Sequence, residues 1–293
     1  MIGDTPQLTL KTILYATDFS TCSQKAGLYA ALIAKYFSAR LVIVHAFTLS
    51  QAALETEADH KLVSRQRKDL QLLLGQKSAE LGLGTVNLTA MLLEGSPEKV
   101  LAELANDHAP TLVVLGTHGG GRVERGLIGS VAEKILRSTT WPCFTVGPRV
   151  ASPPENALPF RRILYATDFN PAAAHAAVFA ISFAEACGAK IEVLNVIKEE
   201  TVAHPDRLGR LRSEFYKALD QLVPDHAKEF CDPRTFVEVG NAHHRILQHI
   251  DEYACDLLVL GIRKTSHLGM EMRSSGAFQL IVDARCPVLT VTG

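Results

Sequence analysis

Short apolar runs alternate along this chain with longer amphipathic stretches. In the first half, the runs that are typical of strands are TILYATD, RLVIVHAF, NLTAMLLEG, TLVVLGT and CFTVG. The stretches that are typical of helices fall between them, at residues 23–37, about 60–81, 97–106 and 130–138. Strands that are apolar throughout, each followed by a helix, indicate a parallel sheet with helices on both faces. The pattern therefore predicts an open, doubly wound α/β domain with five strands.

The second half of the chain repeats this order. Its apolar runs are RILYATD, KIEVLNVI, RTFVEVG, DLLVLGI and PVLTVTG, and ILYATDF is identical at residues 13–19 and 163–169. The offset between the copies is 150 residues at first and 145 from Gly95 and Gly240 onward, so the middle connection is shorter in the second copy. A period of this size indicates duplicated domains and not a solenoid of short repeats. We expect one domain at residues 1–148 and another at residues 160–293.

Composition and charge narrow the class of protein. The 293 residues carry a formal net charge of −1, and 47% of them are hydrophobic. This balance favours neither nucleic acid nor an anionic membrane as a partner. There is no apolar run of about 18 residues and no basic start of the kind a signal peptide has, so neither a spanning helix nor secretion is expected. The six cysteines form no C-x-x-C pair, which is the pattern of free thiols in a reducing cytoplasm.

Two of the predicted strands end at the place where a sheet of this kind binds ligands. In the strand order 3-2-1-4-5, strands 1 and 4 are neighbours, and ligands bind beyond their carboxyl ends. Asp18 follows the first strand, while Gly129 and Ser130 begin the helix after the fourth. The N–H groups and positive dipole end of that helix suit phosphate oxygens, and Ser130 is also a candidate helix cap. The glycines after the fourth strand are Gly116, Gly119, Gly120 and Gly121. The sequence predicts a phosphate site here, and the alternative is that these glycines only form a tight turn.

Three segments together resemble a known family. ATDFS near the start, VIVHAF in the second strand, and G-x-x-G followed after nine residues by G-S are similar to the ATP-binding class of the universal stress protein family. The likeness covers nearly the whole chain twice, so the chain resembles a tandem member. The resemblance implies a five-stranded parallel α/β fold, an adenine nucleotide (ATP, ADP or AMP) as ligand, and dimerisation through the last strand.

The resemblance also implies a place for each site residue. Asp18 would lie beside the ribose and phosphates, where a carboxylate also suits a divalent ion such as Mg²⁺ or Mn²⁺. Ala16 and Thr17 would line the base pocket, and Ala46 would meet the adenine edge. The phosphates would lie against Gly116, Gly119, Gly129 and Ser130, with Thr117, His118, Gly120 and Val131 near them.

Some of these residues have a simpler interpretation. Asp18 could equally be the N-cap of the following helix, and Ser20 is another candidate cap. His118 is expected to be exposed to solvent rather than bound to phosphate. His45 ends an apolar strand and is expected to be a near-core histidine with satisfied hydrogen bonds.

Three further histidines invite a metal interpretation. His243 and His244 have no usual ligand at their i+4 positions, and His249 lies five residues after His244, off its helix face. The three side chains are therefore not expected to converge on a zinc ion. We expect them to lie on a solvated helix face.

The second copy departs from the phosphate pattern. It keeps Thr167, Asp168 and Gly261, but Lys264 and Ser274 stand where the first copy has glycines. A side chain at these positions would fill space that a phosphate oxygen needs, although a lysine ammonium can itself bind phosphate. The motif of the second domain is therefore expected to be degenerate, and one nucleotide is expected per chain.

The last strand of each domain, at residues 143–147 and 287–292, would be a sheet edge in this strand order. Short apolar edges favour pairing with another strand. The linker at residues 148–159 contains four prolines and is expected to be an extended spacer that spans about 35 Å. We therefore expect an intrachain pseudo-dimer in which these strands meet across a pseudo-two-fold axis. A homodimer of chains is a further option.

These features lead to one main functional hypothesis and two alternatives. The first is a cytoplasmic stress-response or regulatory protein that holds an adenine nucleotide in its first domain. Hydrolysis would be slow at most, because no general base is visible to activate a water. The second is a nucleotide hydrolase or adenylyl-transferring enzyme that uses Asp18 and a divalent ion. The third is a scaffold without nucleotide.

Overall fold

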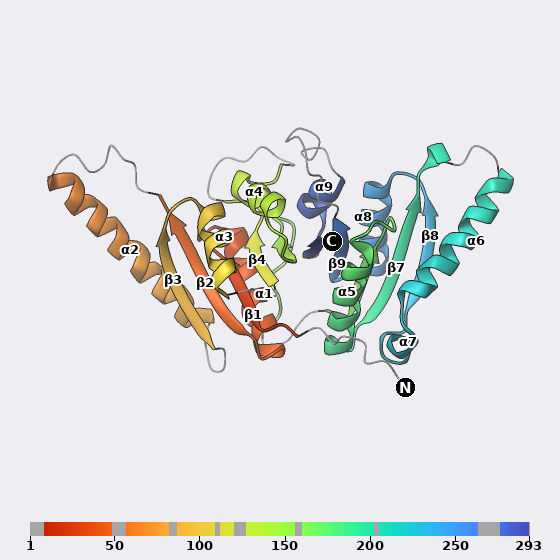
Figure 1. Cartoon of the computed structure of the whole chain (residues 1–293), viewed down its shortest axis with the longest axis horizontal. Helices are drawn as coiled ribbons and strands as arrows, with labels where there is room; N and C mark the ends of the chain where they lie inside the picture. The colour runs from red at the N-terminus through yellow and green to blue at the C-terminus, as the bar shows by residue number, and fades with distance from the viewer. Residues whose placement is uncertain are drawn as a thin grey trace.

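The computed structural model describes residues 9–48, 57–81, 87–108, 112–119, 127–155, 160–201, 205–262 and 276–292. Ten strands within these ranges form one sheet, in the order β3-β2-β1-β4-β5-β10-β9-β6-β7-β8. Figure 1 shows the two halves side by side along the longest axis of the molecule. Each half has the strand order 3-2-1-4-5 that the sequence predicts, and the two halves meet at their last strands.

The first domain alternates strands and helices as its apolar pattern predicts. Neighbouring strands within it are parallel. The predicted helices agree with the observed ones to within three residues at each end. Its elements are β1 (Thr12–Ala16), α1 (Thr21–Tyr36), β2 (Arg40–Phe47), α2 (Glu57–Leu81), β3 (Leu88–Glu94), α3 (Pro97–His108), β4 (Leu112–Gly116), α4 (Ser130–Ser138) and β5 (Cys143–Val146).

The second domain differs mainly in its middle connection. Within the described residues, one helix of 25 residues, α2, lies between β2 and β3, whereas β7 and β8 are joined through a 3-10 helix of 3 residues and two α-helices, of 18 and 7 residues. Pro224 is the N-cap of the shorter one, a place where its missing N–H costs no hydrogen bond. The elements are β6 (Arg162–Ala166), α5 (Ala173–Cys187), β7 (Lys190–Ile197), η2 (Glu199–Thr201), α6 (Pro205–Leu222), α7 (Asp225–Cys231), β8 (Arg234–Val239), α8 (Ala242–Tyr253), β9 (Leu257–Ile262), α9 (Gly276–Asp283) and β10 (Val288–Thr292).

Successive residues of the central strands point into two different cores. In β1, Ile13 and Tyr15 join a cluster that also contains residues of α1 and α5. Leu14 joins a cluster on the opposite face, together with residues of α3, α4, α8 and α9. Side chains alternate between the two faces of a strand, and both faces are covered here. This double burial explains why the strands are apolar throughout.

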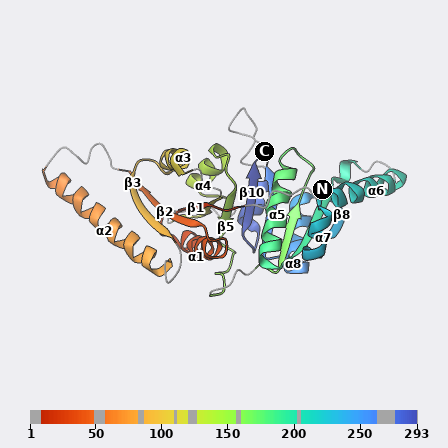
Figure 2. The ribbon, with the colours of Figure 1, turned by 60° about the horizontal axis from the view of Figure 1, so that its bottom comes forward.

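The two domains join through β5 and β10, which pair antiparallel with Phe144 opposite Leu289. Thr145 Oγ1 also donates a hydrogen bond of 2.9 Å to the Val288 carbonyl across this seam. Figure 2 shows the two strands adjacent at the centre of the molecule. The predicted pairing of the last strands within one chain is confirmed. Residues 148–155 of the linker contain neither helix nor strand.

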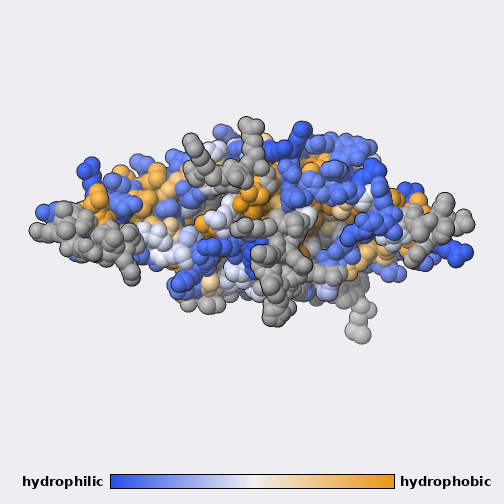
Figure 3. All heavy atoms as spheres, turned by 90° about the horizontal axis from the view of Figure 1, so that it is seen from above, coloured by the Kyte–Doolittle hydropathy of each residue, from blue (hydrophilic) through white to orange (hydrophobic). Residues whose placement is uncertain are grey.

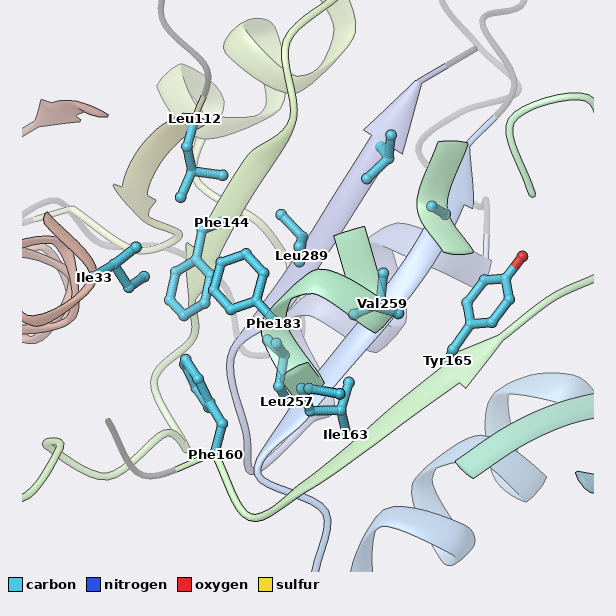
Figure 4. Close-up of a cluster of buried hydrophobic side chains, with 14 of the residues drawn as sticks. Ile33, Leu112, Phe144, Phe160, Ile163, Tyr165, Phe183, Leu257, Val259 and Leu289 are labelled. Carbon is cyan, nitrogen blue, oxygen red and sulfur yellow. The ribbon is translucent and has the colours of Figure 1, made fainter. Parts of the chain in front are cut away.

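A row of aromatic rings packs beneath this seam (Figure 4). The ring centroids of Phe144 and Phe160 are 6.1 Å apart, and those of Phe160 and Phe183 are 5.9 Å apart. Tyr29 of α1 lies 5.6 Å from Phe144. These rings come from both domains, so the two halves share one continuous apolar core.

The face of the molecule that Figure 3 displays is mostly hydrophilic. Figure 3 shows hydrophobic residues in small, separate groups on the face that it displays. Large exposed hydrophobic side chains include Leu62 and Leu72 on α2 and Phe230 on α7. Scattered residues of this kind are normal on a folded protein. In the described part of the chain, no helix has both the length and the apolar character that a membrane crossing requires.

Candidate functional site

A cavity of about 380 Å³ opens at the carboxyl ends of β1 and β4 in the first domain. Its volume falls within the range of about 300–1,000 Å³ that is common for small-molecule sites. At this point the connections that leave the two neighbouring strands diverge, because their crossover helices lie on opposite faces of the sheet. The cavity is lined by Ala16, Thr17, Asp18, Ser23, Val44, Ala46, Pro97, Leu101, Leu115, Gly116, Thr117, Gly119, Gly129, Ser130, Val131, Ala132 and Ile135.

Ten of the twelve residues that the sequence predicts for the site line this cavity. His118 does not line it, and Gly120 lies outside the described residues. Sequence reasoning missed the apolar walls, which include Leu101 of α3 and Ile135 of α4. These are ordinary inward-facing helix positions, and no motif distinguishes them from the rest of the core.

Ser20, and not Asp18, caps the helix that follows β1. The Ser23 N–H donates to Ser20 Oγ at 3.3 Å, and the Ser20 hydroxyl donates to the His118 carbonyl at 2.9 Å. Asp18 Oδ1 instead accepts the Ser20 N–H at 3.0 Å. One hydroxyl thus ties the loop after β1 to the loop after β4, and the exposed Asp18 carboxylate borders the cavity.

Gly119 lies close to the carboxylate of Asp18. A Cβ on Gly119 would lie 2.6 Å from Asp18 Oδ2, well inside contact distance. The carboxylate therefore rests directly against the backbone of the glycine loop. This arrangement brings the residues after β1 and β4 together, as the sequence predicts.

The helix α4 begins at the cavity without a side-chain cap. Its N-cap is Gly129, so the expectation that Ser130 caps this helix is wrong, because Ser130 already lies in the first turn. The Gly129 N–H donates to the Thr117 carbonyl at 2.8 Å, and a Cβ on Gly129 would meet the same oxygen at 2.9 Å. The N–H groups of a first helical turn attract anions when no side chain takes them.

Gly116 has a packing role in addition to its place in the cavity. A Cβ there would lie 2.5 Å from the Ser23 nitrogen, in the backbone of α1. The corresponding Cβ on Gly261 would lie 3.0 Å from the backbone of Ala172 before α5. Both copies keep this glycine, and in both it lets the helix after the first strand approach the fourth strand closely.

We expect Gly116→Ala to destabilise the protein by about 1–3 kcal/mol, and Gly261→Ala to cost less. The added methyl group must displace backbone at Gly116, whereas the contact at Gly261 is half an ångström longer. Urea unfolding followed by circular dichroism measures both, with Gly75→Ala on the exposed face of α2 as the control. An equal or larger loss at Gly261 would contradict this account.

The structure confirms the expected environment of His45 but not that of His118. His45 Nδ1 donates to the Thr17 carbonyl at 2.7 Å and its ring packs against Phe19, so the prediction of a satisfied near-core histidine is confirmed. His118 is half-buried and lies 2.9 Å from the Thr117 hydroxyl, so the predicted exposure is wrong. Burial lowers the pKa of His118 below its usual value, which favours a neutral ring.

The second domain keeps the frame of this site with different residues. Asn170 Nδ2 donates to the Gly261 carbonyl at 2.8 Å, which ties together the same two loops that Ser20 joins. Asn195 Nδ2 donates to the Thr167 carbonyl at 2.9 Å, in the place of His45. Lys264 and Ser274, on which the prediction of a degenerate motif rests, lie outside the described residues.

The three histidines of α8 do not share one environment. His244 is exposed, and His243 Nε2 lies 3.1 Å from Asp283 Oδ2. His249 is buried, so the prediction of a solvated face is wrong for this residue. Its helix turns that position toward the sheet, where Glu192 of β7 meets it.

Comparison with known proteins agrees with this architecture. The sequence profile of the Universal stress protein family matches residues 9–147 and 159–292. A universal stress protein of Methanocaldococcus jannaschii is 32% identical over 139 residues, which cover 46% of this chain and 81% of that protein. A putative universal stress protein of Staphylococcus saprophyticus is 31% identical over 154 residues, which cover 52% of this chain and 91% of that protein.

Solved structures share this fold over nearly the whole chain. A universal stress protein from Archaeoglobus fulgidus superposes with a TM-score of 0.70 at 18% identity, with 96% of both chains covered. A protein of unknown function from Pseudomonas aeruginosa superposes with a TM-score of 0.60 at 15% identity, with 97% of this chain and 92% of that chain covered. The profile match in both halves shows that the chain belongs to the universal stress protein family and carries the family domain twice.

Proposed function

We propose that the first domain binds an adenine nucleotide (ATP, ADP or AMP) in the cavity at the ends of β1 and β4. The protein would act as a nucleotide-dependent stress-response or regulatory module. The single observation that carries this proposal is the uncapped N-terminus of α4, which opens into a cavity of nucleotide size beside a glycine loop. Phosphate oxygens find unpaired N–H donors and a positive dipole end at such a place.

The lining of the cavity suits both parts of a nucleotide. Val44, Leu101 and Ile135 give it an apolar wall against which a flat base can pack. Gly129 and Ser130, at the start of α4, are where the phosphates would lie. Asp18 lies between β1 and the glycine loop, and its carboxylate suits ribose hydroxyls or an accompanying Mg²⁺ or Mn²⁺.

Efficient hydrolysis is not part of this proposal. Among the cavity-lining residues that the structure describes, Asp18 alone has an ionisable side chain. One of its oxygens accepts the Ser20 N–H, and the other is the acceptor that we propose binds ribose hydroxyls or the divalent ion. A general base has to reach the attacking water with a free acceptor, and no second carboxylate or imidazole lines the described cavity to supply one. We therefore propose slow turnover at most, and a steady-state ATPase assay on the purified chain tests this directly.

We expect Gly119→Ala to weaken ATP binding about tenfold, or ~1.4 kcal/mol, without unfolding the protein. The new methyl group would displace Asp18 Oδ2, which is the movable end of a side chain, rather than backbone. Asp18→Asn is expected to produce a loss of similar size. Isothermal titration of the full chain with ATP gives the affinity and the expected stoichiometry of one nucleotide per chain.

Gly75→Ala is the matched control for this experiment. Gly75 lies in α2, where an added Cβ meets nothing within 4 Å. The control should bind ATP like the natural chain and gain up to about 1 kcal/mol in helix stability. Unchanged affinity in both Gly119→Ala and Asp18→Asn would remove Asp18 from the site, and absence of binding by the natural chain would overturn the proposed function.

A further inference from the structure

The second domain contains a buried cluster of three potential metal ligands. Glu192 lies on β7, His249 on α8, and Cys255 just before β9. Their relative exposures are 0%, 1% and 6%, and their ligand atoms all lie within 4.8 Å of one another. The helix α8 packs against β6 and β7 in this domain (Figure 1). Three elements that are distant in sequence thus bring an oxygen, a nitrogen and a sulfur atom together.

Each oxygen of the Glu192 carboxylate has a different role. Oε1 accepts a hydrogen bond of 2.6 Å from Arg162 Nη1. Oε2 lies 2.7 Å from His249 Nε2 and 3.7 Å from Cys255 Sγ. The guanidinium of Arg162 therefore orients the carboxylate and leaves its second oxygen directed at the imidazole and the thiol.

The first domain forms the same fold without two of these groups. In the first domain the positions of Glu192 and His249 are occupied by Val42 and Leu104, which are buried in the apolar core on the same face. The strand registers agree, because Val42 pairs with Leu14 as Glu192 pairs with Leu164. Buried ionic groups are commonly no more stabilising than apolar residues of similar volume. Stability alone thus gives no reason for this set of residues in the second domain.

We propose that Glu192, His249 and Cys255 form a binding site for Zn²⁺. Carboxylate, imidazole and thiolate are the usual protein ligands of this ion. A tetrahedral ion with Zn–N and Zn–O distances of about 2.0–2.2 Å and a Zn–S distance of about 2.3 Å holds its ligand atoms roughly 3–4 Å apart. The cluster needs only shifts of about an ångström to meet this geometry. A water molecule would complete the coordination.

A second carboxylate, that of Glu238, lies beside His249 and suits a metal-bound imidazole. His249 Nδ1 lies 3.4 Å from Glu238 Oε1, and a carboxylate in this position orients a metal-bound imidazole. In the metal-free protein both ring nitrogens face carboxylates. A zinc ion would bind the lone pair of His249 Nε2 and the thiolate of Cys255, so binding would displace the hydrogens from these two atoms.

This inference does not rest on the proposed nucleotide site. Glu192 is the third residue of β7 and Cys255 precedes β9, so the cluster lies toward the amino ends of the strands of the second domain. The cavity lies at the carboxyl ends of strands in the first domain. Changes to the cluster are expected to leave ATP binding unaltered.

The test measures metal binding by the full, metal-free chain. Equilibrium dialysis against Zn²⁺ with a competing chelator, followed by elemental analysis, should give one zinc ion per chain. Titration with Co²⁺ should produce a thiolate-to-cobalt absorption band in the near ultraviolet. Cys255→Ser should abolish the band and weaken zinc binding at least about tenfold. Cys187→Ser on α5, a half-buried thiol outside the cluster, should leave the band and the affinity unchanged.

A double variant separates ligand loss from unfolding. Glu192→Val with His249→Leu gives the second domain the residues that the first domain packs at these positions. It should fold, as seen by circular dichroism, and bind no zinc above the background of the surface histidines. Equal zinc retention by the natural chain and this double variant would overturn the proposal, and so would a cobalt band that survives Cys255→Ser.

Discussion

A folded Ser130→Glu protein is expected to bind ATP at least about 100-fold more weakly than the natural chain, a loss of ~2.8 kcal/mol. Ser130 is the first residue of α4 and lines the cavity where the phosphates are proposed to lie. A carboxylate there would take the N–H groups that the phosphates need and would repel their negative charge. Two like charges about 4 Å apart near a protein surface cost on the order of 4 kcal/mol.

The same change should not harm the fold. A negative charge in the first turn of a helix interacts favourably with the helix dipole, typically by about 0.3–1 kcal/mol. Ser130 is exposed and its side chain does not cap the helix. The melting temperature is therefore expected to stay the same or to rise, so that loss of ATP binding cannot be attributed to unfolding.

Asn241→Asp is the matched control, because it adds one negative charge at the N-cap of α8 in the second domain. Isothermal titration should give the natural ATP affinity for this variant. If Ser130→Glu binds ATP as tightly as the natural chain does, the phosphates do not lie at the start of α4. If Asn241→Asp weakens binding equally, the effect comes from net charge and not from the site.

The second large effect is expected at the seam between the domains. Phe144→Ala should lower the free energy of unfolding by about 3–5 kcal/mol. Phe144 is 0% exposed, pairs with Leu289 across the seam between the domains, and packs against the rings of Tyr29 and Phe160. Removing it leaves a cavity in the part of the core that both domains share, where neither domain can close the gap alone.

Urea unfolding followed by circular dichroism and tyrosine fluorescence measures this loss. Phe230→Ala on α7 is the control, because that side chain is 66% exposed and its removal should change the stability by no more than about 0.5 kcal/mol. A loss below about 1 kcal/mol for Phe144→Ala would mean that the seam contributes little to stability, and that each domain is held together by its own core.

Much of the fold could be predicted from local pattern. The strands of this sheet are buried on both faces, so their apolar runs are continuous and easily recognised. The repeat of ILYATDF and the shared spacing of the later strands were enough to predict two domains with one strand order. The edge position of the last strands then predicted the pairing of β5 with β10, because an unpaired apolar edge favours a partner.

The candidate site was predicted only in part. Asp18 and the glycines could be placed because strand order brings the ends of β1 and β4 together. The apolar walls from α3 and α4 could not, because a side chain that faces a cavity and one that faces the core have the same pattern in the sequence. The choice between Asp18 and Ser20 as helix cap was also undecided, since both are good capping residues and only the backbone path between them selects Ser20.

The sequence by itself determined the duplicated α/β architecture and the residues that follow β1 and β4, because these depend on periodicity and spacing along one chain. Only the tertiary structure decided that His249 is buried against Glu192 and Cys255, and that Gly116 and Gly261 accommodate a neighbouring helix. A polar residue on an amphipathic helix is solvated or buried according to what the facing strand offers it. That partner lies 57 residues away for His249, beyond the reach of any local pattern.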